Sequence, residues 1–121
     1  MADAGDAFAV EGRIINPPVL AGLLAEQTRR RPNRVALRFE GRDYTFAELE
    51  TWSNRAANAL TALGMKPGDR LAWIARNVAI FWPALFGAAK IGAVMTPINW
   101  RLAPAEGAAI LKDSSARVLV G

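Results

Sequence analysis

Neither cysteine nor histidine occurs among the 121 residues of this chain. The absence of cysteine excludes disulfide bonds, thiol catalysis and thiolate metal sites. The absence of histidine excludes a Ser–His–Asp triad, an imidazole general base and the usual zinc ligands. Any chemistry carried by these residues therefore proceeds without two of the side chains that enzymes use most.

The rest of the composition is that of a globular chain. Hydrophobic residues make up 52% of the chain and charged residues 21%, which excludes intrinsic disorder and a collagen-like fibre. The length predicts one domain, and a domain of this size buries about two thirds of the surface that its unfolded chain exposes. A true hydrophobic core is therefore expected.

The charge is moderately basic, with 15 Lys and Arg against 11 Asp and Glu and a net charge of +4. The densest basic group lies at the C-terminal end of a predicted helix and comprises Arg29, Arg30, Arg31 and Arg34. Arginine at the C-terminal end of a helix complements the helix dipole, so a solvated helix end is the favoured interpretation. An anionic membrane surface or partner is the second, and nucleic acid is disfavoured because the two signs of charge are mixed elsewhere.

No segment predicts a signal peptide or a membrane span. Asp3, Asp6 and Glu11 stand where a signal peptide carries positive charge. The apolar run over residues 78–98 contains Lys90 and is interrupted by proline and glycine, so a buried helix followed by a buried strand explains it better. We therefore expect a cytoplasmic protein, and contact with a membrane surface stays an open alternative.

The first part of the chain predicts a helix and a hairpin. Residues 1–17 lack periodicity and are expected to form a flexible lead-in. Leucines at helical spacing predict a helix over residues 18–31, and Pro32 ends it. Alternation of apolar and polar residues predicts a strand over residues 35–39, which returns after a turn as a second strand over residues 42–45.

The helix that follows is the best specified element. Thr45 and Glu48 have the spacing of a capping box, in which each side chain accepts a hydrogen bond from the other residue's backbone amide. Tyr44 and Leu49 occupy the hydrophobic-staple positions around that box. Gly64 is placed to end the helix in the left-handed conformation.

Apolar strands and helices alternate from residue 71 to the end of the chain. This βαβαβ pattern with right-handed crossovers predicts an α/β fold with a parallel sheet and helices on its faces. Asn77 is a candidate N-cap for the first of these helices, and Pro104 suits the first turn of the second. The predicted strands are residues 71–75, 93–96 and 118–120, and the predicted helices are residues 77–91 and 104–113.

The helix predicted over residues 77–91 is apolar nearly all round, and the strand over residues 118–120 is apolar throughout. Both need more cover than the remaining residues supply. We therefore expect residues 18–121 to be an incomplete piece of a larger domain. An apolar helix face and an unpaired strand edge also favour self-association, so a homo-oligomer is expected.

The residues by themselves assemble no catalytic site. The carboxylates are scattered, and the glycines match no phosphate-binding loop. Ser114 and Ser115 lie at a predicted helix end with no base available, so capping or turn roles are favoured over nucleophilic ones. Judged by these residues alone, the chain is an α/β domain without an active site.

Several short segments nevertheless resemble a known family in their order and spacing. Residues 44–49, Tyr-Thr-Phe-Ala-Glu-Leu, resemble the first core motif of the adenylate-forming enzymes, and residues 88–102 resemble the second. Residues 64–70 and 111–116 resemble the segments between and after these motifs. Each segment alone is weak, but together they resemble this family over about residues 19–121, most closely the acyl-CoA synthetases and fatty-acid–CoA ligases.

The resemblance implies an enzyme that uses ATP and Mg²⁺ to convert a carboxylic acid, in particular a fatty acid, into an acyl-adenylate. The acyl group then passes to coenzyme A. It also implies that the family's phosphate loop, later nucleotide-binding motifs, hinge and catalytic lysine lie outside these residues. We therefore expect no catalytic residue, metal ligand or bound cofactor here, and no activity from the 121 residues alone. The alternative is a stand-alone binding or interaction module on the same scaffold.

One binding residue follows from the resemblance, namely Arg101. In some coenzyme A ligases the arginine of the Asn-x-Arg-Leu loop contacts phosphates of coenzyme A, a role that suits a guanidinium. The alternative is that Arg101 binds backbone carbonyls of its own loop. Two residues depart from the family pattern: Ala103 stands where a Ser or Thr helix cap is frequent, and Ile80 replaces a frequent acidic residue.

Overall fold

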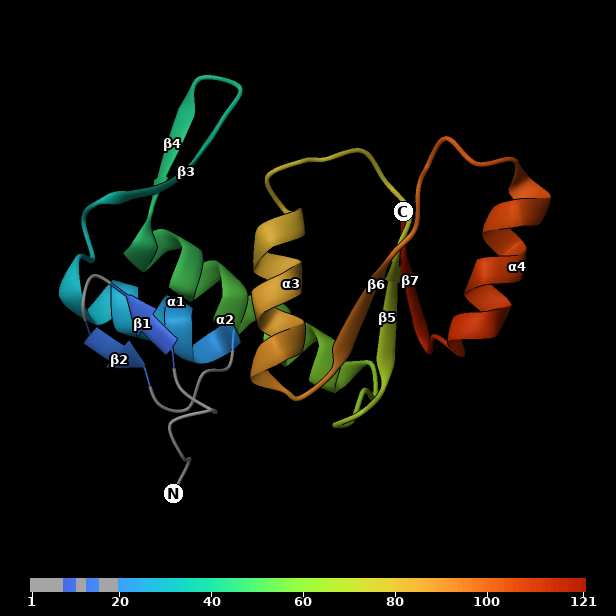
Figure 1. The fold of residues 1–121 in the computed structure, drawn as a ribbon, viewed down its shortest axis with the longest axis horizontal. Coiled ribbons are helices and arrows are strands. Elements are labelled where there is room, and N and C mark those ends of the chain that lie inside the picture. The colour runs from blue at the N-terminus through green and yellow to red at the C-terminus, as the bar shows by residue number, and fades with distance from the viewer. Residues whose placement is uncertain (1–7, 11–12, 16–19) are drawn as a thin grey trace. The chain divides into compact units, whose positions relative to one another are not determined.

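The computed structural model describes residues 8–10, 13–15 and 20–121. The chain divides into two compact units, residues 1–52 and residues 53–121, with the boundary inside the second helix. Strands in the first unit pair as antiparallel neighbours, whereas strands in the second unit form a parallel sheet (Figure 1). The prediction of an α/β fold is therefore confirmed.

Two short strands lie within the segment for which a flexible lead-in was expected. β1 (Phe8–Val10) pairs antiparallel with β2 (Arg13–Ile15), with Phe8 opposite Ile15. Strands of three residues are too short to show an alternation that a sequence pattern could detect. The other residues of the range 1–17 lie outside the described part, and flexibility there stays a prediction.

Helix α1 (Leu20–Arg30) confirms the predicted amphipathic helix, and its own residue Leu24 is buried. The expected basic end is present, since Arg29 and Arg30 stand in the last turn. The Arg29 guanidinium donates to Glu26 at 2.8 Å, and this hydrogen bond and the charge of Glu26 raise the pKa of Arg29. Such pairing within the helix fits the interpretation of a solvated helix end.

The predicted hairpin is formed by β3 (Val35–Phe39) and β4 (Arg42–Thr45), with Phe39 opposite Arg42. The two turn residues, Glu40 and Gly41, both have positive φ angles, 49° and 77°. This pair of angles is typical of the type I′ turn, whose twist matches that of the flanking strands.

Helix α2 (Phe46–Ala62) begins at the predicted capping box. The Thr45 amide donates to Glu48 Oε2 and the Glu48 amide donates to Thr45 Oγ1, both at 3.1 Å. The Tyr44 ring stacks on Trp52, with ring centroids 5.4 Å apart, while the staple contact of Tyr44 with Leu49 stays a prediction.

The end of α2 also follows the prediction. Gly64 has a φ of +88°, and the Met65 amide donates to the Leu60 carbonyl at 3.1 Å. A left-handed residue followed by such a hydrogen bond is the usual way in which a glycine closes a helix.

The second unit contains the parallel sheet in the order β6-β5-β7. Its strands are β5 (Arg70–Trp73), β6 (Val94–Pro97) and β7 (Val118–Val120). Leu71 of β5 lies opposite Met95 on one side and Val118 on the other. Because β5 is the middle strand, Leu71 and its next two residues are buried, as its uninterrupted apolar sequence predicted.

Two helices join these strands, α3 (Phe81–Lys90) and α4 (Pro104–Ser114). Helix α3 connects β5 to its neighbour β6. Helix α4 then connects β6 to β7, which lies on the other side of β5. Right-handed crossovers in opposite directions put the two helices on opposite faces of the sheet, as Figure 1 shows. Pro104 opens α4 as predicted, and the preceding Ala103 makes no side-chain cap.

The predicted start of α3 is wrong. Asn77 does not cap it, because the helix begins at Phe81 after Ile80, which makes no side-chain cap hydrogen bond. Pro83 becomes the third helical residue in this way, and its missing amide falls in the first turn, where a helix leaves its amides unpaired. The helix is also less enclosed than predicted, since Trp82 is 41% exposed.

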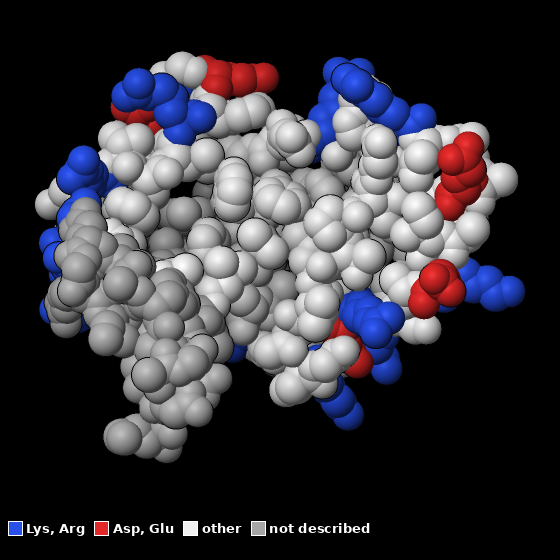
Figure 2. Space-filling view, viewed as in Figure 1, with Lys and Arg blue, Asp and Glu red and all other residues white. Residues whose placement is uncertain are grey.

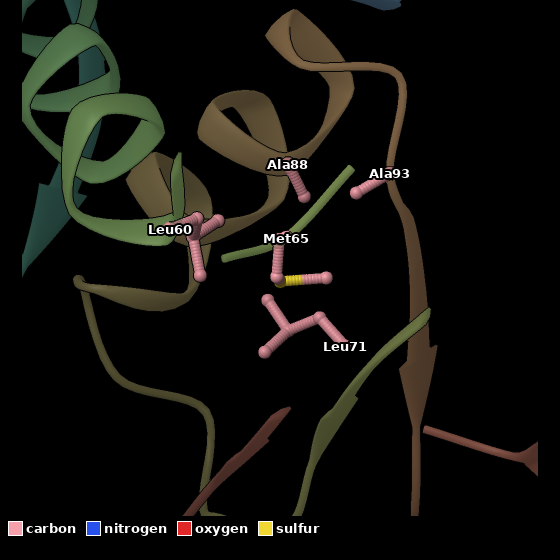
Figure 3. Packing of buried hydrophobic residues seen from close by; sticks show 5 residues of the cluster. All are labelled: Leu60, Met65, Leu71, Ala88 and Ala93. Atoms are coloured by element: carbon pink, nitrogen blue, oxygen red, sulfur yellow. The ribbon is translucent and has the colours of Figure 1, made fainter. Parts of the chain in front are cut away.

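The core of the second unit lies between the end of α2, helix α3 and strand β5. Figure 3 shows its five buried residues converging there: Leu60, Met65, Leu71, Ala88 and Ala93. Gly87 of α3 lies so close to α2 that an added Cβ would stand 2.7 Å from the Cβ of Ala56. Among the described residues, no helix is long and apolar enough to cross a membrane.

Candidate functional site

A cleft opens at the carboxyl end of the parallel sheet in the second unit. Trp73 and Pro97, the last residues of β5 and β6, lie opposite each other there, and the loop that follows each strand borders the cleft. Ligands of parallel α/β sheets bind outside the carboxyl ends of the strands, so this cleft is the candidate site. The cleft has a volume of about 470 Å³ and is lined by Trp73, Ala75, Asn77, Phe81, Pro97, Ile98, Asn99, Trp100 and Arg101.

Backbone hydrogen bonds hold the loop after β6 in place. The Ile98 amide continues the ladder by donating to the Trp73 carbonyl at 2.7 Å. The Asn99 side chain then accepts a hydrogen bond from the Arg101 amide at 2.9 Å, which forms an Asx turn. Ile98 is buried beneath this turn, so the turn presents Trp100 and Arg101 from a fixed base.

The inner wall of the cleft is aromatic. Trp73 is buried, and its ring meets Phe81 edge-on, with centroids 5.4 Å apart and an interplanar angle of 79°. Such edge-to-face pairs are a favourable arrangement of aromatic rings, because the positive edge of one ring meets the negative face of the other. The wall therefore offers an apolar surface beside a polar rim.

Two arginines lie on the indole ring of Trp100, one of the residues that line the cleft. The Arg76 guanidinium carbon lies 4.7 Å from the centre of the Trp100 ring, and that of Arg101 lies 5.1 Å from the same point. Both distances are within the range of a cation–π interaction. Within the described part of the chain, neither arginine forms an ion pair with a carboxylate. We call Arg76 and Arg101 the rim arginines.

Figure 2 shows a group of Lys and Arg side chains with no acidic side chain among them over this end of the sheet. Planar guanidinium groups bind phosphate and carboxylate with two parallel hydrogen bonds, so the rim suits an anionic ligand. The apolar inner wall next to it suits a ligand that also has an apolar part.

Arg101, the one binding residue expected from the sequence, lies on this rim. Its guanidinium faces Trp100 and makes no hydrogen bond to a carbonyl of its loop among the described residues. The alternative role, in which Arg101 binds carbonyls of its own loop, stays untested. Contact with coenzyme A stays a prediction.

Sequence reasoning missed Arg76 and Trp100 as site residues. Arg76 stands three residues after the buried strand β5, which is a position from which parallel sheets bind ligands. That signal was available, but the partner ring of Arg76 lies in another loop, and only the fold shows their contact.

The two serines considered in the sequence analysis, Ser114 and Ser115, lie at the end of α4 and take part in its structure. The Ser114 hydroxyl donates to the Leu111 carbonyl at 2.8 Å, and Ser115 ends α4 in the left-handed conformation with a φ of 54°. In the part of the chain that the structure describes, no group of three carboxylates could hold a metal ion. Among the described residues there is therefore no cluster that would hold a metal ion by protein side chains alone.

Comparisons with known proteins agree with one another. The family model described as AMP-binding enzyme matches residues 24–121. The fatty acid–[acyl-carrier-protein] ligase ScoC of Streptomyces coeruleorubidus is 44% identical over 88 residues, which cover 73% of this chain and 17% of that protein. The long-chain-fatty-acid–CoA ligase FadD13 of Mycobacterium tuberculosis is 46% identical over 76 residues, which cover 63% of this chain and 15% of that protein.

Solved structures show the same similarity. A fatty acyl-CoA synthetase of Mycobacterium tuberculosis matches 84% of this chain and 20% of its own, with 37% identity and a TM-score of 0.81. The anthranilate CoA ligase AuaEII, solved with anthranoyl-AMP, matches the same shares with 33% identity and a TM-score of 0.79. The chain thus spans about one fifth or less of the length of these proteins.

Proposed function

Because this chain belongs to the family of AMP-binding enzymes, we propose that it is part of a ligase that joins a carboxylic acid, specifically a fatty acid, to coenzyme A. The observation that carries this proposal is the match of residues 24–121 to the family together with 46% identity to a long-chain-fatty-acid–CoA ligase. The structural similarity to a fatty acyl-CoA synthetase supports it.

The proposed reaction has two steps. The carboxylate attacks the α-phosphorus of ATP, which forms an acyl-adenylate and releases pyrophosphate. The thiol of coenzyme A then attacks the acyl carbon, and AMP leaves as the thioester forms. The implied cofactors are ATP, Mg²⁺ and coenzyme A.

Among the described residues, those lining the cleft suit one of these groups, coenzyme A. The rim arginines have the chemistry that binds phosphate, so Arg101 is proposed to contact a phosphate of coenzyme A. No described cluster of side chains would hold a metal ion by itself, and no residue is assigned to the adenylation step. We propose that residues 18–121 are the N-terminal portion of the large domain, and that the 121 residues alone are inactive.

The remaining expectations concern partners and location. A homo-oligomer is supported by the outer strands β6 and β7, which each pair on one side only among the described residues. Val94 and Leu119 on these strands are half exposed, and apolar strand edges favour association. A cytoplasmic location and contact with a membrane surface stay predictions.

The decisive experiment is carboxylate-dependent ATP–pyrophosphate exchange by the intact product of the gene, with fatty acids as substrates. We expect exchange, and formation of acyl-CoA when coenzyme A is added. The 121-residue chain is the matched control and should show no exchange.

The two parts of the proposal fail separately. An intact gene product that shows no exchange with any fatty acid would refute the ligase, and if its mass were 13.0 kDa the stand-alone binding module would be favoured. Exchange by the 121-residue chain would instead refute its proposed inactivity.

A further inference from the structure

Two arginines from different loops meet on one aromatic ring. Arg76 comes from the loop between β5 and α3, and Arg101 comes from the loop between β6 and α4. Their guanidinium carbons lie 4.7 and 5.1 Å from the centre of the Trp100 ring, so they are closer together than about one Debye length at 0.1 M salt. The two positive charges repel each other, and salt does not screen this repulsion fully at such a separation.

The contacts with Trp100 offset part of this repulsion. The negative face of an indole attracts each guanidinium, and stacking leaves the N–H groups at the guanidinium edge free to donate. Trp100 is 42% exposed, so a solute can approach the guanidiniums that lie on its ring. An anionic ligand that contacts both guanidiniums would offset this repulsion and accept hydrogen bonds from each of them.

Arginines at the amino end of the same sheet are used differently. There Arg70 donates to the Ser114 carbonyl at 2.7 Å, and Arg117 lies 3.6 Å from a carboxylate oxygen of Asp69. The fold thus supplies acceptors for the arginines at one end of the sheet. At the other end, the described residues supply none for the rim arginines.

We propose that Arg76, Trp100 and Arg101 form one binding site for the phosphate groups of the acceptor thiol, with Arg76 as a binding residue equal in weight to Arg101. Trp100 is a positioning residue that holds both guanidiniums at the rim of the cleft. The identity of the ligand as coenzyme A rests on the proposed function, whereas the preference for a phosphate-bearing small molecule rests on the geometry alone.

The first test is calorimetric titration of the chain with inorganic pyrophosphate. We expect Arg76→Gln to weaken binding about tenfold, because one charge-assisted contact is lost, and Arg101→Gln to do the same. Trp100→Ala should weaken binding by a similar factor although it changes no charge, since it releases both guanidiniums. Arg76→Lys should recover only part of the loss, because an ammonium neither stacks on the ring nor donates from a planar fork.

The matched control is Arg42→Gln. Arg42 also lies on an aromatic ring, 4.6 Å from the centre of Tyr44, but it belongs to the first unit, which does not line the cleft. This variant removes the same charge and the same kind of contact, and its pyrophosphate affinity should stay within twofold of the wild type. Equal weakening by Arg42→Gln and Arg76→Gln, or wild-type affinity of Arg76→Gln, would overturn the site.

The second test identifies the ligand in the intact gene product. Pantetheine carries the thiol of coenzyme A without its phosphates, so Arg76→Gln should lower the ratio of kcat/KM for coenzyme A to kcat/KM for pantetheine about tenfold. An unchanged ratio would overturn the assignment to the acceptor thiol. If the gene product made no thioester while pyrophosphate binding still depended on Arg76, the anion site would stand and the proposed function would fail.

A lipid headgroup carries phosphate too, so phosphatidylglycerol vesicles serve as a separate arm of the test. We expect co-sedimentation of the chain with these vesicles to be the same for the wild type and Arg76→Gln. Loss of co-sedimentation in Arg76→Gln without any effect on pyrophosphate binding would show that the site binds a membrane surface, which would overturn the proposal.

Discussion

The two compact units of the chain pair their strands over different distances along the sequence. In the described part of residues 1–52, β1 pairs with β2 and β3 pairs with β4, so each pair joins strands that are consecutive in the chain. In residues 53–121, β5 pairs with β6 and β7, and a helix intervenes before each of them. Closing a long connection costs more chain entropy than closing a short one, and burial has to offset that cost.

The contacts of the two units differ accordingly. In the first unit the side-chain contacts include local polar ones at exposed positions, such as Arg38 with Asp43 and the box of Thr45 with Glu48. In the second unit Leu71 and Ala88 are buried in an apolar core between distant segments. Close packing should therefore matter most in the second unit, and each local polar contact in the first should matter less.

The largest expected effect tests that packing, at Gly87. A Cβ added there would stand 2.7 Å from Ala56 Cβ and 2.9 Å from the Ala57 amide nitrogen, and that backbone atom cannot move aside without shifting the helix. We expect Gly87→Ala to lower the free energy of unfolding by about 1–3 kcal/mol, as overpacked cores do. A urea melt measures this change.

Gly107 provides the matched control for that experiment. It also lies within a helix, but an added Cβ would meet no atom within 4 Å. Gly107→Ala should therefore raise stability by up to about 1 kcal/mol, because alanine loses less entropy than glycine when a helix forms. Equal effects of Gly87→Ala and Gly107→Ala on the free energy of unfolding would show that α3 does not approach α2 as closely as these distances indicate.

An intermediate effect is expected at the capping box of the first unit. Thr45→Ala removes the hydroxyl that accepts the hydrogen bond from the Glu48 amide. It should lower the free energy of unfolding, measured in a urea melt, by about 1 kcal/mol. Thr45→Ser keeps the hydroxyl and should stay close to the wild type. If Thr45→Ser lost as much stability as Thr45→Ala, packing of the threonine methyl group would explain the effect and the cap would not.

The smallest effect is expected for the ion pair of the hairpin. The Arg38 guanidinium donates to Asp43, with its Nη2 3.0 Å from Oδ2, and this hydrogen bond holds the pKa of Asp43 below its usual value. A lowered pKa means that the pair stabilises the fold above the ordinary aspartate pKa, about 4, and that this contribution disappears as the pH falls through the lowered pKa. Since both side chains are solvent-exposed, the contribution is small at any pH.

Asp43→Asn tests this expectation. At pH 7 its urea midpoint should lie slightly below that of the wild type, and the difference should shrink as the pH is lowered below 4. In an Arg38→Gln background, Asp43→Asn should leave the urea midpoint unchanged both at pH 7 and below pH 4. A difference that persists in this background would assign the effect to the turn and not to the ion pair.

Much of the fold could be predicted from the sequence because the relevant contacts are short in range. The capping box spans Thr45 to Glu48, and the left-handed Gly64 closes the same helix within a few residues. The start of α3 was predicted wrongly at Asn77, because a polar residue before an apolar run suggested a cap. Pro83 sets that start instead, since the helix begins two residues before it.

The sequence by itself determined the order of strands and helices from residue 20 onward, the parallel sheet and the membership of the chain in its family. These follow from periodicity, from the right-handedness of crossovers and from motifs that each lie within one segment. Only the tertiary structure decided that Arg76 and Arg101 share the ring of Trp100. Their meeting depends on the register that puts Trp73 opposite Pro97, and a register between distant strands is set by burial of both faces, which no single segment encodes.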